Sequence, residues 1–81
     1  MSDVRINLVC CTQTICNEIA QGVTQKSVAL TYAMAMKSQL QGDDAPDWPT
    51  INQAILERWS FNGLVRVKKR AHDILSGKVQ P

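Results

Sequence analysis

The stretch from Thr24 to Gly42, TQKSVALTYAMAMKSQLQG, decides the fold class of this 81-residue chain. Its main apolar side chains recur every four residues, a spacing that places them on one face of a helix. Thr24 can cap the free N–H groups of the first turn, and Gly42 can end the helix. We therefore expect a helix here, with a core stripe of Val28, Tyr32, Met36 and Leu40.

Two more apolar residues of this stretch, Leu30 and Met34, fall on a different face of the predicted helix. A slightly wide core face would explain them. They are equally compatible with the start of a dimer interface or a partner surface, since methionine is common at binding surfaces.

Downstream, a loop at residues 42–49 with two prolines and three aspartates precedes two further predicted helices. Thr50 can open the first of them, and Asp47 is the alternative cap if Trp48 and Pro49 form its first turn. A turn at residues 60–63, SFNG, separates the two. Their apolar stripes are Ile51, Ile55 and Trp59, then Leu64, Val67, Ala71, Ile74 and Leu75.

Upstream, residues 3–11 are open to two interpretations, because their apolar residues fit both a helical stripe and the alternation of a strand. No second strand pattern follows, so helix is favoured, at least from Thr12 to Gln21, with Gly22 as its end. The prediction is one all-α domain over residues 1–81, a small bundle of three to four helices.

Composition limits the function classes. Cys10, Cys11 and Cys16 are odd in number and close together, unlike the disulfide framework of a secreted scaffold, and the one histidine, His72, is too distant for a metal motif. The first residues lack a signal-peptide pattern, and no apolar run reaches the ~20 residues of a membrane span. No set of residues suggests a catalytic mechanism. We expect a cytoplasmic protein that is not an enzyme and has no cofactor or metal.

Charge is distributed unevenly along the chain. Residues 1–57 hold three basic and six acidic residues, whereas residues 58–81 hold six basic and one acidic. On the last predicted helix, Arg66, Lys69 and Arg70 lie opposite the apolar stripe, flanked by Lys68 and His72. This basic face is compatible with a solvated surface, with a protein partner, or with nucleic acid.

Two aromatic residues, Trp48 in the acidic loop and Phe61 in the turn, are candidate partner-binding residues. Packing against the core is the simpler interpretation of each, and each would be an interface anchor if exposed. Two stretches, residues 19–28 and residues 55–70, match a helix-turn-helix pattern only weakly.

Residues 51–60, INQAILERWS, with residues 63–71, GLVRVKKRA, resemble small proteins of lambdoid phages and prophages, among them the short antirepressors. The similarity covers roughly residues 48–75. It implies a regulatory protein in the bacterial host cytoplasm that binds a phage repressor and lifts its hold on DNA. The partner-binding residues would then be Arg66, Lys69, Arg70, Trp48 and Phe61.

Three other functions remain open: a DNA-binding regulator that uses the basic last helix, an accessory phage inhibitor of a host protein, and a small structural subunit. Self-association is compatible with all of them, since a domain this small has a limited core. No membrane partner is expected.

Overall fold

The computed structural model describes residues 12–21 and 24–80. Its helices are α2 (Thr12–Ala20), α3 (Gln25–Leu40) and α4 (Trp48–Ser76), and these described segments contain no strand. The predicted all-α class is confirmed. The open question about residues 3–11 and the expected helix end at Gly22 lie outside the described residues. None of the described helices combines the length and apolar character needed to cross a bilayer.

Helix α3 begins as its sequence predicts. The Thr24 hydroxyl accepts a hydrogen bond from the Ser27 backbone N–H at 3.2 Å, which satisfies one free donor of the first turn. Val28 and Tyr32 are buried, and Met36 packs partly buried against them. Leu40, however, is 81% exposed, so its assignment to the core is wrong. It lies at the last turn of α3, on the rim between two surface depressions.

Helix α4 begins at the alternative of the two predicted caps. The Asp47 carboxylate accepts from the Thr50 backbone N–H at 3.2 Å and from the Thr50 hydroxyl at 2.8 Å, with Pro49 in the first turn. The Asp47 backbone N–H in turn donates to the Thr12 hydroxyl at 2.8 Å. This bond joins the start of α4 to the start of α2.

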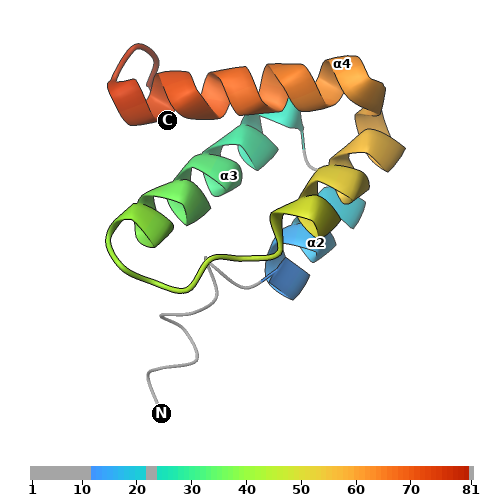
Figure 1. Ribbon diagram of the computed structural model, residues 1–81. Coiled ribbons are helices and arrows are strands. Elements are labelled where there is room, and N and C mark those ends of the chain that lie inside the picture. Colours follow the sequence, from blue (N-terminus) through green and yellow to red (C-terminus); the bar gives the residue numbers. More distant parts are fainter. Residues whose placement is uncertain (1–11, 22–23, 81) are drawn as a thin grey trace.

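The predicted break at residues 60–63 is present, but it occupies a single residue. Ser60 has φ 68° and ψ −179°, and helical backbone resumes directly after it. Figure 1 shows the resulting sharp bend between the yellow part of α4 and its orange-to-red part. The helix therefore consists of two differently directed halves, residues 48–59 and 61–76. The described residues thus form three helices, within the predicted three to four, and the two halves of α4 correspond to the two helices predicted on either side of the turn.

The core lies where α2, α3 and both halves of α4 meet. The N-terminal half of α4 buries its predicted stripe at Ile51 and Ile55, and Trp59 packs half-buried beside them. The C-terminal half buries most of its own predicted stripe, while Ile74 and Leu75 stay partly buried. The fully assembled core comprises Ile15, Ile19, Val28, Ala29, Tyr32, Ala33, Ala35, Ile51, Ile55, Leu64, Val67 and Ala71.

Gly63 is required by close packing just after the bend. A Cβ atom at this position would overlap Trp59 Cβ and would lie 3.3 Å from Trp59 Cγ. We expect Gly63→Ala to destabilise the fold by about 1–3 kcal/mol because of this overlap, although alanine normally favours a helix by ~1 kcal/mol. Urea unfolding measures the change, with the exposed neighbour Asn62→Ala as control. A more stable Gly63→Ala variant would contradict the close approach of Trp59.

Ser60 has a backbone conformation that is natural only for glycine. We expect Ser60→Gly to raise the free energy of unfolding by about 1 kcal/mol, since relief of strain exceeds the entropy that glycine adds to the unfolded chain. Ser38→Gly, inside the regular helix α3, is the matched control and should lower the free energy of unfolding. An equal decrease in the free energy of unfolding for Ser60→Gly and Ser38→Gly would show that Ser60 is not strained.

Candidate functional site

Four residues form an exposed line along the C-terminal half of α4, and we call them the α4 stripe: Phe61, Val65, Lys68 and His72. Their spacings of four, three and four residues place them on one side of the helix. Phe61 is 67% exposed and Val65 is 46% exposed, although both are large apolar residues. The stripe therefore combines two uncovered apolar side chains with a cationic lysine and a histidine.

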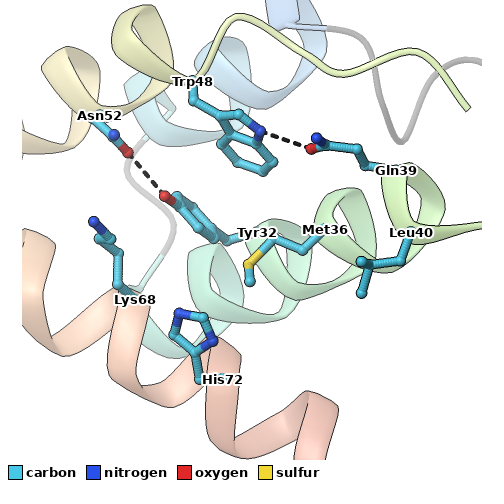
Figure 2. Close-up of a pocket in the computed structure, with 8 residues that line it drawn as sticks. All are labelled: Tyr32, Met36, Gln39, Leu40, Trp48, Asn52, Lys68 and His72. Atoms are coloured by element: carbon cyan, nitrogen blue, oxygen red, sulfur yellow. Dashed lines mark hydrogen bonds between the residues drawn. The ribbon is translucent and has the colours of Figure 1, made fainter.

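The stripe leads into a surface depression of about 390 Å³ between α3 and the two halves of α4. Figure 2 shows Lys68 and His72 on one side of it, with Met36 and Leu40 of α3 on another. The remaining lining residues are Tyr32, Gln39, Trp48 and Asn52. Apolar side chains thus form much of the wall. Polar groups from α3 and from both halves of α4 also line it.

Hydrogen bonds fix the aromatic wall of this depression. The Tyr32 and Trp48 rings lie 4.7 Å apart at a tilt of 40°. The Tyr32 hydroxyl donates to Asn52 Oδ1 at 3.0 Å, and Trp48 Nε1 donates to Gln39 Oε1 at 2.9 Å. Because both polar tips are satisfied within the protein, the rings are held in place while their neighbours remain accessible to a partner.

None of the three basic residues proposed from the sequence, Arg66, Lys69 and Arg70, lines this depression. Arg66 and Lys69 are exposed and Arg70 is half-buried. At 100° per residue, Arg66 and Arg70 lie about 140° and 180° around the helix from Phe61, so they occupy the other flank. Lys69 lies between the flanks, with its Nζ 4.0 Å from the Asp73 carboxylate. The basic residues of α4 therefore lie on two sides of the helix: Lys68 borders the depression, and Arg66 and Arg70 lie on the other flank.

The two proposed aromatic anchors behave differently. Trp48 is half-buried and packs on Tyr32, as the simpler interpretation expected, yet it also lines the depression. Phe61 points away from the core, contrary to that interpretation, because the bend at Ser60 restarts the helix with Phe61 on its outer side. Phe61 is therefore available to a partner directly, and Trp48 only through the depression.

Sequence reasoning treated Lys68 and His72 as flanking residues only, and it gave no role to Asn52 or Gln39 in a site. The helical spacing from Phe61 to His72 was present in the sequence and could have revealed the stripe. The contributions of Asn52 and Gln39 could not be found in this way, because they depend on how α3 packs against the first half of α4.

The other chemically notable group is the Cys16 thiol on α2. It is half-buried and free, and burial together with the charge of Asp47 raises the pKa of the Cys16 thiol. A raised pKa lowers the thiolate fraction and makes the sulfur less reactive. Within the described part of the chain, no three His, Cys, Asp or Glu side chains are grouped so as to hold a metal ion. Cys10 and Cys11 lie outside that part.

No protein-family model, curated protein or solved structure matches this chain. The features of the structure that bear on function are the α4 stripe and the depression beside it.

Tyr32, the single tyrosine of the chain, gives a pH-dependent test of the depression's wall. Burial raises the pKa of Tyr32 above its ordinary value, so folding favours the neutral phenol. Its contribution to stability should be complete below the unfolded pKa of about 10 and be lost as the pH rises through the higher folded value. Tyrosinate absorbance should show a higher midpoint in the native protein than in denaturant.

Urea unfolding between about pH 9 and 11 gives the second readout. Tyr32→Phe should flatten the alkaline loss of stability, whereas lysine deprotonation affects both variants alike. Equal native and denatured midpoints would contradict the burial that raises the pKa of Tyr32.

Proposed function

We propose that this protein acts by binding a protein partner through the α4 stripe and the adjoining depression, without a reaction of its own. The observation that carries this proposal is the exposure of Phe61 and Val65 beside Lys68 and His72. Burying an apolar side chain of this size is favourable by roughly 1.5–3 kcal/mol. Large aromatic residues that become buried at the centre of an interface commonly dominate its affinity.

The charges indicate what such a partner presents. From Arg58 to the last residue the chain has six basic residues and one acidic residue, Asp73. Lys68 has no ion-pair partner among the described residues, so an acidic group of the partner could occupy its vicinity. The matching partner surface is therefore acidic at its edge, with a large apolar side chain to enter the depression.

Protein is favoured over duplex DNA by the apolar members of the stripe. Phosphate groups would attract Lys68 and Lys69, but they would leave Phe61 and Val65 in contact with water. A protein surface covers both kinds of side chain at once. Direct binding to duplex DNA is the competing outcome of the experiment below.

The more specific form of the proposal is an antirepressor. It rests on the resemblance of residues 51–60 and 63–71 to small lambdoid phage proteins, which implies a phage repressor as the partner in the cytoplasm of a bacterial host. Binding through α4 would compete for an acidic patch of the repressor or block the face that contacts DNA. The exposed apolar and basic side chains of the stripe support either mode.

The experiment adds this protein to a purified lambdoid repressor bound to its labelled operator duplex, and follows fluorescence anisotropy at low and near-physiological salt. We expect release of the operator. Phe61→Ala with Val65→Ala should weaken the effect about 30-fold, as expected for an anchor worth about 2 kcal/mol. Charge reversal at the three basic residues outside the stripe, Arg66, Lys69 and Arg70, tests whether they also take part in binding.

Lys78→Glu is the control, because it reverses an exposed charge beyond the end of α4. Circular dichroism should show the same helix content for all variants. Tight binding of the protein itself to duplex DNA that survives salt and the loss of Phe61 would contradict the proposal and favour a DNA reader. If neither set of substitutions changes the release of the operator, α4 does not form the interface with the repressor.

A further inference from the structure

Ser60 joins two stretches of helix that could otherwise be one. It is the single residue of α4 with non-helical backbone angles, and its φ of 68° lies in a region that is natural only for glycine. The segment around it, residues 57–64, contains no proline, so helical hydrogen bonding could continue through it. The bend therefore holds backbone strain that α4 would lose on straightening.

Gly63 is the second residue on which the bend depends. A Cβ atom at this position would overlap Trp59 Cβ in the bent helix. Along a straight helix, Cβ atoms four residues apart are about 5–6 Å from each other, so this overlap belongs to the bent form alone. Glycine at position 63 thus permits the bend, whereas serine at position 60 opposes it. The balance between a bent and a straight α4 is set by these two residues.

Straightening would direct the buried residues of the two halves of α4 to opposite sides. At 100° per residue, the two buried sets would on average lie roughly 170° apart around a straight helix. These sets are Ile51 and Ile55 in the first half, and Leu64, Val67 and Ala71 in the second. One core could then bury only one of the sets. A straight α4 therefore needs a second core for its C-terminal half.

The monomer itself shows what that second core would be. The C-terminal half of α4 lies against α3 (Figure 1), where Ile74 and Leu75 border Leu30 and Ala33. A chain whose α4 has straightened exposes both members of this contact: the apolar side of its released half and the surface that this half has left on α3. Each surface fits the other. Two opened copies can therefore satisfy each other completely.

We propose that two copies of this chain exchange the C-terminal halves of α4, residues 61–76, with Ser60 as the hinge. In this dimer each α4 is one straight helix of about 44 Å. Its first half packs on α3 of its own chain, and its second half packs on α3 of the other copy. The core contacts of the monomer are thereby formed again between chains. Short, strained hinges of this kind favour such an exchange.

Concentration controls the exchange, and the exchange is slow. Association costs translational and rotational freedom, so the monomer is favoured in dilute solution. The dimer relieves the strain at two hinges, so it is favoured as the concentration rises. Because the core must open before the halves can be exchanged, the two forms interconvert only through partial unfolding. Monomer and dimer should therefore separate on gel filtration, which a surface dimer in rapid equilibrium would not do.

Substitutions at the hinge test the proposal in two directions. The full chain is kept at about 500 µM, well above the range of weak association, in mild urea, and is then analysed by gel filtration with light scattering. Ser60→Ala and Gly63→Ala should raise the dimerisation constant several-fold, because they favour the straight helix or oppose the bend.

Ser60→Gly should lower the dimerisation constant by about tenfold or more, since glycine fits the bend and weakens a straight helix. Asn62→Ala, exposed and helical in both forms, is the control and should leave the constant unchanged. Equal dimer fractions in Ser60→Gly and Ser60→Ala, or no dimer in any variant, overturn the proposal. Neither residue 60 nor residue 63 belongs to the α4 stripe, so exchange and partner binding are tested separately.

Spin labels measure the straightening directly. In a background with Cys10, Cys11 and Cys16 replaced by serine, Gln53→Cys and Ser76→Cys place two labels at exposed positions of α4. Along a straight helix these positions are about 35 Å apart, and the bend brings them closer. Labelled chains are diluted into excess unlabelled protein, so that pulsed electron spin resonance reports distances within one chain. We expect about 35 Å in the dimer and a shorter distance in the monomer. A dimer with the distance of the monomer would overturn the exchange.

Discussion

Both halves of α4 pack on the same helix, α3. They can do so because the positive φ of Ser60 bends α4 between its two halves. The first half reaches α3 through the Tyr32–Trp48 contact and the hydrogen bond to Asn52. The second half places a nearly buried Leu64 in the same core. A straight helix of 29 residues would be about 44 Å long and could cover α3 with one half only. The bend is therefore what closes the core of so small a domain.

The same bend determines which side chains of α4 are exposed at the surface. It starts a new helical phase at Phe61, and that phase places an aromatic ring outward while Leu64 and Val67 turn inward. It also brings Lys68 and His72 to the edge of a depression whose opposite wall belongs to Trp48, a residue twenty positions earlier in the chain. The strained backbone at Ser60 and the candidate site thus have one structural cause. Residual strain close to a functional surface is a recurring association in proteins.

The sequence was informative where a structural signal is local. The cap at Thr24 and the alternative cap at Asp47 depend on side chains within three residues of the groups they satisfy, so both could be predicted. The break near residue 60 was located by the loss of helical spacing. Its form was not predicted, because the residue with positive φ is a serine, while the nearby Gly63 serves a contact with Trp59. Leu40 was misplaced because periodicity does not report where the neighbouring helices end.

For the candidate site, the basic residues and Phe61 could be named from the sequence, and helical spacing could also have divided the basic residues between two flanks. Charge counting treats Arg66, Lys68 and Lys69 as equivalent, whereas the helical phase places Lys68 at the depression and Arg66 far around the helix. The walls of the depression were beyond sequence reasoning. Tyr32, Gln39 and Asn52 belong to two helices whose relative placement depends on tertiary packing.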